Sequence, residues 1–198
     1  MVMDGSVILS VSNFQYGFRK GFSTVLPLIQ LTENIFSSLN NKNHHISIFI
    51  DLTKAFDTVH HRILLDKLAN SGVRGMALDW FASYLADREY CVGIGARSST
   101  SRTINIGLPQ GSILGPILFL VYVNELPNVS ELLQPILFAD DTTVSISHPN
   151  FIHLVNDLNL ELDKIYQWSI SNRLSINADK SELILITKRR VERNSFRQ

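Results

Sequence analysis

Two adjacent aspartates, Asp140 and Asp141, stand in the stretch ILFADDTTV, which spans residues 136–144. They follow an apolar run and precede a Thr-Thr-Val segment. Adjacent carboxylates repel each other, and burying either one without a partner is costly. We therefore expect a positive group beside them, and a metal ion is a candidate. The alternative is that both are polar residues of a hairpin turn, where aspartate is common.

A third aspartate, Asp51, ends the run ISIFID, residues 46–51, which is typical of a buried strand. The three carboxylates converge if this strand and the 140/141 turn lie side by side at one edge of a sheet. Carboxylate oxygens suit Mg²⁺, which proteins usually hold with one or two carboxylates together with substrate phosphates. Two such ions about 3.5–4 Å apart can bind the attacking hydroxyl and the leaving oxygen of a phosphoryl transfer.

The elements that precede the paired aspartates are predicted from hydrophobic periodicity and from helix end signals. A capped helix comes first, followed by the strand that ends on Asp51. Two helices that pack on each other come next, and then a hairpin whose loop is the polar stretch RSSTS. The predicted helices cover residues 23–41, 61–72 and 76–88, and the hairpin strands cover 89–96 and 102–107.

A second hairpin carries the paired aspartates in its turn. Before it, Ser112 can cap a helix that starts at Ile113, and after it a long helix starts at Phe151. Two short strands then close the chain. The hairpin strands cover residues 135–138 and 142–147, and the closing strands cover 174–177 and 183–187. This order of elements predicts an α+β fold, with an antiparallel sheet backed by helices on one face.

The bulk composition limits the function classes. The 198 residues are 45% hydrophobic, which suits one domain, or one domain and part of another, with a real core. The formal net charge is zero, so nothing predicts a global attraction to nucleic acid. Cys91 is the only cysteine, which excludes an intrachain disulfide and favours an intracellular protein, either nuclear or cytoplasmic. The longest apolar stretch, residues 113–123, is too short to cross a membrane.

Five ordered stretches resemble a known family. FIDLTKAFDTVHH, GLPQGSILGPILF and FADDTTV occur in this order and at this spacing in reverse transcriptases, and QYGFRKGFST and NRLSINADKSELILIT are similar to the blocks that flank them. The resemblance extends from about Asn13 to Lys188 and is closest to non-LTR, LINE-like retrotransposons of the jockey type. It implies a polymerase palm with a ferredoxin-like core and the activity of an RNA-directed DNA polymerase.

The resemblance also implies a domain organisation. Residues 1–45 correspond to a partial fingers segment, and residues 46–188 correspond to the palm, with a helical and hairpin finger insertion at about 60–106. Residues 189–198 form a basic tail. The family's upstream fingers strand and its thumb are not evident in the sequence, so we expect a truncated core.

The resemblance places catalysis on three residues. Asp51, Asp140 and Asp141 match the family's catalytic, metal-binding aspartates, and the main-chain oxygen of Leu52 would be a further metal ligand. The implied cofactor is a pair of Mg²⁺ ions, for which Mn²⁺ can substitute. The implied partners are an RNA template, a DNA primer and a deoxynucleoside triphosphate, with no membrane involved.

Four further residues match the nucleotide pocket of the family. Phe56 matches an aromatic position that excludes a ribose 2′-hydroxyl, although an ordinary core residue is an equal alternative. Gln110 and Gly111 match the pocket loop, which without the family is only a turn. Lys180 matches a lysine near the pyrophosphate leaving group, where a surface lysine is the alternative.

Two basic residues, Arg19 and Lys20, resemble fingers residues that contact template or nucleotide phosphate, and a solvated loop is the alternative. The whole chain also has a second interpretation. A catalytically silent remnant would keep the fold and act at most as a module that binds nucleic acid or protein.

Overall fold

The computed structural model describes residues 2–3, 7–8 and 10–188, so the predicted basic tail, residues 189–198, lies outside the described residues. The chain divides into two compact units, each made of two segments of the chain. We call residues 12–53 with 124–198 the sheet unit, and residues 1–11 with 54–123 the helical unit. The predicted boundaries at 45/46 and 60–106 stay a prediction.

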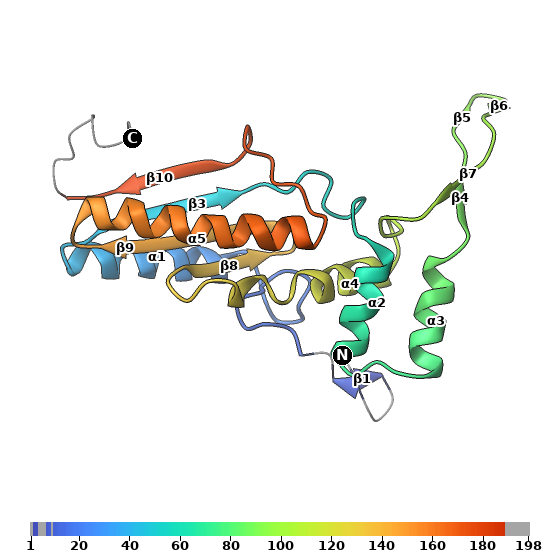
Figure 1. Cartoon of the computed structure of the whole chain (residues 1–198), viewed down its shortest axis with the longest axis horizontal. Helices are drawn as coiled ribbons and strands as arrows, with labels where there is room; N and C mark the ends of the chain where they lie inside the picture. The colour runs from blue at the N-terminus through green and yellow to red at the C-terminus, as the bar shows by residue number, and fades with distance from the viewer. Residues whose placement is uncertain (1, 4–6, 9, 189–198) are drawn as a thin grey trace. The chain divides into compact units, whose positions relative to one another are not determined.

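The sheet unit is built on four antiparallel strands in the order β10-β3-β9-β8 (Figure 1). The strands are β3 (His44–Ile50), β8 (Gln134–Phe138), β9 (Asp141–His148) and β10 (Glu182–Ile186). Numbered along the chain, this spatial order is 4-1-3-2, the order of a ferredoxin-like sheet. The predicted α+β class with an antiparallel sheet is confirmed.

Two helices cover opposite faces of this sheet. They are α1 (Val25–Asn40) and α5 (Phe151–Ser171). His44 and His45 are neighbours on β3, so their side chains point to opposite faces. The ring of His45 hydrogen-bonds Ser38 of α1, whereas the ring of His44 packs edge-on against Phe151 of α5. Figure 1 likewise has α5 in front of the sheet and α1 behind it. The prediction that helices back only one face was wrong, because β3 is buried on both faces.

The pairing of β3 with β9 is specified by apolar residues. Ile46 lies opposite Ile146, and Ile48 lies opposite Val144, and all four side chains are buried. A shift by one residue would move these side chains to the other face of the sheet and break their packing. The register therefore follows from the hydrophobic pattern, and it carries through to the end of β3.

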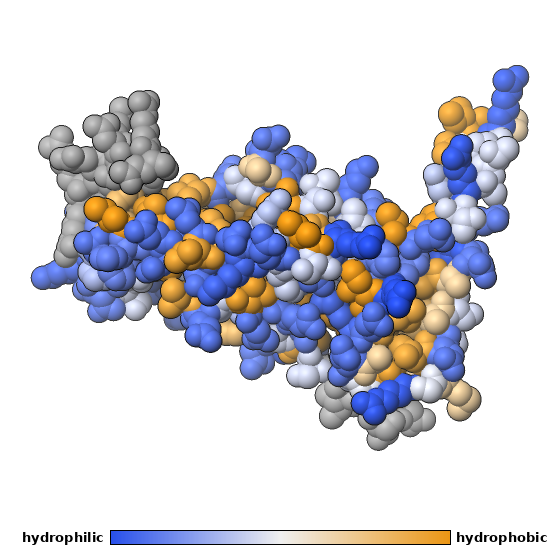
Figure 2. Space-filling model, viewed as in Figure 1, coloured by the Kyte–Doolittle hydropathy of each residue, from blue (hydrophilic) through white to orange (hydrophobic). Residues whose placement is uncertain are grey.

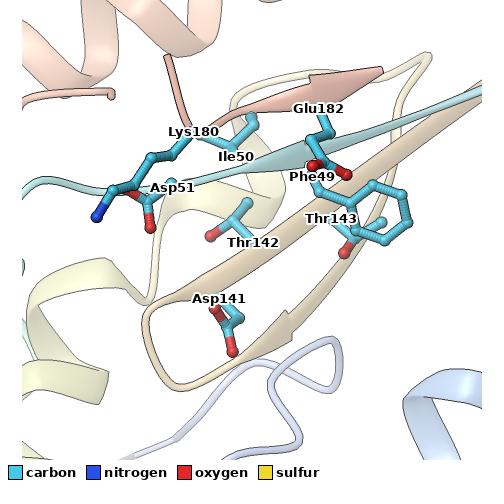
Figure 3. Close-up of a pocket in the computed structure, with 8 residues that line it drawn as sticks. All are labelled: Phe49, Ile50, Asp51, Asp141, Thr142, Thr143, Lys180 and Glu182. Atoms are coloured by element: carbon cyan, nitrogen blue, oxygen red, sulfur yellow. The ribbon is translucent and has the colours of Figure 1, made fainter. Parts of the chain in front are cut away.

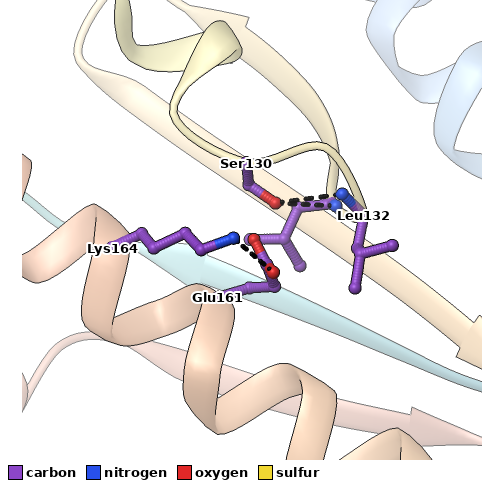
Figure 4. A network of polar contacts seen from close by, with 5 residues as sticks. Ser130, Leu132, Glu161 and Lys164 are labelled. Carbon is purple, nitrogen blue, oxygen red and sulfur yellow. Dashed lines mark hydrogen bonds and ion pairs between the residues drawn. The ribbon is translucent and has the colours of Figure 1, made fainter.

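The helix α5 is fixed at its start and in its middle. The Asn150 side chain caps it by accepting hydrogen bonds from the N–H groups of Ile152 and His153, at 2.9 and 3.1 Å. In its middle, the buried carboxylate of Glu161 lies 2.7 Å from the ammonium of Lys164 (Figure 4). Near this ion pair, the hydroxyl of Ser130 accepts the N–H groups of Leu132 and Leu133, at 3.3 and 2.9 Å, in the loop before β8 (Figure 4).

Among its described residues, the helical unit contains three helices and three short two-stranded ribbons. Helix α2 packs on α3 and on α4, so the prediction that the helices at 61–72 and 76–88 pack on each other is confirmed. A hydroxyl of Ser112 accepts a hydrogen bond from the N–H of Gly115 at 2.9 Å, which agrees with the predicted cap. The helices are α2 (His61–Asn70), α3 (Met76–Leu85) and α4 (Leu114–Val123), and the ribbons are β4 (Arg88–Tyr90) with β7 (Arg102–Ile104) and β5 (Gly93–Ile94) with β6 (Arg97–Ser98). The strands β1 (Val2–Met3) and β2 (Val7–Ile8) pair with each other.

Two predicted strand boundaries were wrong. The hairpin turns at Gly95, whose φ is +60°, and Arg97 and Ser98 pair in β6 instead of lying in the loop. A glycine that can adopt positive φ therefore decided the turn. Of the predicted strand at 174–177, only Ile176 makes a bridge, to Leu52. The 3-10 helix η1 (Leu126–Asn128) precedes β8.

The molecular surface carries exposed apolar residues. Across the described ranges, no helix is both long enough and apolar enough to span a bilayer. Apolar side chains nevertheless reach the surface over α5 and β10 (Figure 2). The large apolar residues of α5 and β10 that are exposed are Ile152, Leu160, Tyr166, Ile170, Leu183 and Ile184.

Candidate active site

The strand register brings Asp51 and Asp141 together. The last pair of the β3–β9 ladder joins Ile50 to Thr142. The next residues on the two strands are Asp51, directly after β3, and Asp141, the first residue of β9; both line one pocket, although they are ninety positions apart in the sequence. Both strands belong to the sheet unit. The fold therefore places Asp51 and Asp141 at the same end of the sheet, whereas the gathering of all three aspartates into one metal site stays a prediction.

The paired aspartates lie at a tight turn between β8 and β9. Phe138 pairs with Asp141, which leaves Ala139 and Asp140 as the two turn residues. Ala139 has a φ of +59°, in the left-handed region that a non-glycine residue seldom adopts. Asp140 is half-buried and Asp141 is exposed. The turn thus holds two acidic side chains at the end of the sheet where β3 also ends.

Asp51 is fixed by the segment that precedes β10. Its N–H donates to the hydroxyl of Ser181 at 3.1 Å, and its carbonyl oxygen accepts from the N–H of Asn177 at 2.8 Å. The next residue, Leu52, bridges to Ile176. These contacts hold the main chain of Asp51 and Leu52 from one side and leave the Asp51 carboxylate to face the pocket.

An open pocket lies at this end of the sheet, with a volume of about 450 Å³. Figure 3 shows Asp51, Asp141 and Lys180 around it. Lys180 is exposed and comes from the segment that also fixes Asp51. The pocket therefore combines three carboxylates, those of Asp51, Asp141 and Glu182, with one cationic side chain. Its lining residues are Phe49, Ile50, Asp51, Asp141, Thr142, Thr143, Lys180 and Glu182.

The carboxylates influence one another electrostatically. The pKa of Asp141 is raised, first because its carboxyl group is partly buried although the residue as a whole is exposed. The negative charges of Asp140 and then of Asp51 raise this pKa further. A raised carboxyl pKa means that the ionised form is disfavoured by its surroundings. The site thus carries more negative charge than the protein itself compensates.

A divalent cation fits these residues. Carboxylate oxygens are the ligands that hard divalent cations take, and the repulsion around Asp141 would be relieved by one. Within the part of the chain that the structure describes, no three His, Cys, Asp or Glu side chains are already gathered into a metal site. Mutual repulsion of like charges favours such a spread arrangement, and a bound cation would draw the carboxylates together.

The predicted nucleotide-pocket residues Phe56, Gln110 and Gly111 belong to the helical unit, whereas the aspartates belong to the sheet unit. A common pocket therefore stays a prediction. The ring of Phe56 is half-buried and stacks on Phe119 at 4.3 Å between centroids. The Gln110 amide donates to the carboxylate of Asp57 at 2.9 Å. Gly111 has a φ of +79° and open space where a side chain would stand.

The two basic residues of the predicted fingers segment differ in their surroundings. The guanidinium of Arg19 donates to the carbonyl oxygens of Ser12 and Gln15, at 3.1 and 2.9 Å, and lies 4.1 Å from the ring centroid of Phe22. Arg19 thus closes its own loop, which is a structural role. Lys20 is exposed, and its contact with template or phosphate stays a prediction.

Sequence reasoning missed two residues that support the aspartates. Ser181 binds the Asp51 N–H, and the Gln15 side chain contacts the turn residue Ala139. Gln15 is 2% exposed. Buried polar residues usually have a hydrogen-bond partner, but the partners of Gln15 and Ser181 are distant in the sequence. The signal that could have indicated these two residues is that both lie inside the stretches that resemble a known family.

Comparison with known proteins identifies a family and relatives to which this chain is similar. The family model described as reverse transcriptase (RNA-dependent DNA polymerase) matches residues 5–196. The RNA-directed DNA polymerase from the mobile element jockey of Drosophila melanogaster is 29% identical over 190 residues, which are 92% of this chain and 21% of that protein. The probable RNA-directed DNA polymerase from transposon BS of the same organism is 31% identical over 177 residues, 84% of this chain and 19% of that protein.

A solved structure has a similar fold. The telomerase of Candida tropicalis, in complex with the TWJ fragment of telomeric RNA, matches 82% of this chain and 29% of that chain, with a TM-score of 0.58 and 14% identity. At this identity the likeness concerns the fold alone. The chain spans about a fifth of the length of the two Drosophila relatives.

Proposed function

Since the chain belongs to the reverse transcriptase family, we propose that it carries the palm of an RNA-directed DNA polymerase of a non-LTR retrotransposon. The observation that supports this most is the position of Asp51 next to Asp141 at the end of the β3–β9 ladder. Acidic groups from two strands converge there beside an open pocket and a lysine. Such a site suits transfer of a nucleotidyl group with the help of divalent cations.

The proposed reaction joins a deoxynucleotide to a primer on an RNA template. The primer 3′-hydroxyl loses its proton to solvent water and attacks the α-phosphorus, so that a new P–O bond forms. The bond between the α-phosphorus and the bridging oxygen to the β-phosphate breaks, and pyrophosphate leaves with that electron pair. The attacking oxygen, the phosphorus and the leaving oxygen must lie in line, so most of the catalysis comes from positioning these groups and from stabilising charge.

The carboxylates of Asp51, Asp140 and Asp141, with the main-chain oxygen of Leu52, would hold two Mg²⁺ ions, for which Mn²⁺ can substitute. When bound, these ions supply Lewis-acid stabilisation of the attacking and leaving oxygens. The contacts of Asp51 with Ser181 and Asn177 support this assignment, because they keep its main chain still.

Lys180 would offset charge on the leaving pyrophosphate, which agrees with its place in the lining of the pocket. Phe56 would exclude a 2′-hydroxyl from the sugar site, and Gln110 and Gly111 would line the nucleotide pocket. Lys20 would contact phosphate of the template or the nucleotide. The names of the Drosophila relatives support the RNA template and the DNA product.

Primer extension tests the proposed function. The chain, an RNA template, an annealed DNA primer and deoxynucleoside triphosphates are combined with Mg²⁺ or Mn²⁺, and product length is measured. We expect metal-dependent extension that falls by about 100-fold or more in Asp140→Asn, because a charged ligand is lost. Asp163→Asn, on the exposed side of α5, is the matched control and should extend like the wild type.

Extension that persists in Asp140→Asn would contradict the assignment of this site. Absence of extension at every metal concentration, together with RNA binding that weakens as salt rises, would instead support the silent remnant. The wild-type chain distinguishes the two outcomes, because it extends the primer in the first and does not extend it in the second.

A further inference from the structure

We propose that Gln15 is a positioning residue whose side-chain amide holds the paired-aspartate turn in shape and so sets the affinity of the site for a divalent cation. This inference rests on the proposed function, because it concerns the same carboxylates. It adds a residue from a segment more than a hundred positions earlier in the chain, within the same unit.

The Gln15 amide contacts both polar groups of Ala139. Its Oε1 accepts the N–H of Ala139 at 2.9 Å, and its Nε2 donates to the carbonyl oxygen of Ala139 at 3.3 Å. The same Oε1 also accepts the N–H of Gly17 at 2.8 Å. Only a side-chain amide offers an acceptor and a donor together in this way. Because the side chain is buried, loss of the amide would leave three main-chain groups without these partners.

The turn needs such support because Ala139 has a positive φ. The left-handed conformation is unfavourable for an L-residue with a side chain, because Cβ comes too close to the following carbonyl oxygen. Alanine has this cost, whereas glycine does not. The left-handed conformation of an alanine therefore persists only where its surroundings determine it. The two hydrogen bonds from Gln15 act on this residue, which directly precedes Asp140 and Asp141.

The segment around Gln15 is itself anchored on the neighbouring strand. The N–H of Tyr16 donates to the carbonyl oxygen of Leu137 at 2.8 Å, and the N–H of Leu137 donates to Phe14 at 2.9 Å. A Cβ added at Gly17 would stand 2.2 Å from the nitrogen of Ala139, so only glycine permits this approach. Main chain and side chain thus hold the turn from the same side.

The fixed turn matters for cation binding because its two carboxylates repel each other and Asp51. A loose turn would let them separate, and a cation would then have to order the turn as it binds. That ordering reduces affinity, in the same way that loss of a residue supporting a metal ligand does. A turn ordered in advance avoids this loss.

The test measures Mn²⁺ binding to the full chain by electron paramagnetic resonance, with Mn²⁺ alone as the probe. In Gln15→Met, which keeps the length of the side chain without its amide, we expect about tenfold weaker Mn²⁺ binding. Exchange of the Ala139 and Gly17 amide hydrogens should also become faster. If Gln15→Met does not fold, Gln15→Asn is used, which keeps a buried amide but shortens it by one methylene, and the same loss is expected.

A matched control separates positioning from general destabilisation. Asn150→Ala removes the cap of α5, which costs stability but lies away from the turn, so Mn²⁺ affinity should be unchanged. A folded Gln15 variant that binds Mn²⁺ as tightly as the wild type would overturn the inference. If Asp141→Asn also leaves Mn²⁺ binding unchanged, the proposed metal site itself is wrong, which is a separate failure.

Discussion

At the residue scale, the candidate site depends on charges that the protein leaves uncompensated. Asp141 has a raised pKa because of partial burial and of two neighbouring carboxylates, Asp140 and Asp51. Repulsion between neighbouring carboxylates is unfavourable for the stability of the fold. The arrangement is explained when a cation and a phosphate-bearing substrate complete it, as the proposed function requires.

The charge of another acidic residue, Glu161, is compensated by other residues of the chain. Its pKa is lowered, first by the hydrogen bond to Lys164, then by the hydrogen bond to Ser130, and these effects exceed that of burial. This carboxylate is structural, because its partners belong to the chain itself. Glu161 therefore differs from Asp51, Asp140 and Asp141, which the proposed function assigns to binding a ligand.

Glu161→Gln is expected to destabilise the protein by about 1–3 kcal/mol at pH 7, because charge-assisted hydrogen bonds are replaced by weaker ones. The measurement is urea unfolding followed by circular dichroism, with Asp163→Asn on the same helix as the control. The pKa of Glu161 is lower in the folded state than its ordinary value of 4.5, so its contribution is complete above pH 4.5 and is lost as the pH falls through the folded-state pKa. The difference between the wild type and Glu161→Gln should therefore shrink at low pH. A constant difference from pH 7 to pH 3 would contradict this account.

At the scale of elements, β3 is the central support of the site. It pairs with β9 and β10, it is covered by α1 on one face and α5 on the other, and Asp51 directly follows its last residue. A strand that is buried on both faces cannot shift its register without exposing apolar side chains. The position of Asp51 beside Asp141 is thus a result of packing along the whole strand.

Ile46→Ala on this strand is expected to lower the free energy of unfolding by about 2–5 kcal/mol, because the side chain is 1% exposed and its loss leaves a cavity. Ile184→Ala on the edge strand β10 is the matched control, with a side chain that is 45% exposed. It should cost about 1 kcal/mol or less. Chemical denaturation compares the two variants. Equal losses would mean that β3 is not the packed centre of the sheet.

At the scale of the whole molecule, the surface combines exposed apolar side chains with a net charge of zero. Apolar residues stand out over α5 and β10, where they cover part of the sheet unit (Figure 2). Proteins without net charge associate more readily, since no long-range repulsion keeps the molecules apart. Both features favour self-association in dilute buffer.

Solubility is expected to be lowest near pH 7.0, the isoelectric point, and to rise as the pH moves away from it in the range where the chain stays folded. Leu160→Lys, at a side chain that is 67% exposed, should raise solubility at pH 7 and reduce association in sedimentation velocity. Asn159→Lys, the exposed neighbour, adds the same charge without removing an apolar side chain. If both variants behave alike, charge and not the apolar surface controls association.

The sequence by itself determined most of the local elements and indicated the family. Periodic apolar residues predicted the long helix, in which Leu154, Leu158 and Ile165 are buried as expected. The run that ends on Asp51 predicted a strand, and the Asp-Asp pair predicted a turn, because these depend on neighbours within a few residues. Five ordered blocks indicated the family, which the match over residues 5–196 confirms.

Only the tertiary structure decided which distant groups meet. That helices cover both faces of the sheet depends on how α1 packs, and the turn of the first hairpin depended on one glycine conformation. The contacts of Gln15 with Ala139 and of Ser181 with Asp51 join residues more than a hundred positions apart. Such contacts depend on the packing of the whole sheet, because a buried polar group must find a partner wherever the fold places one.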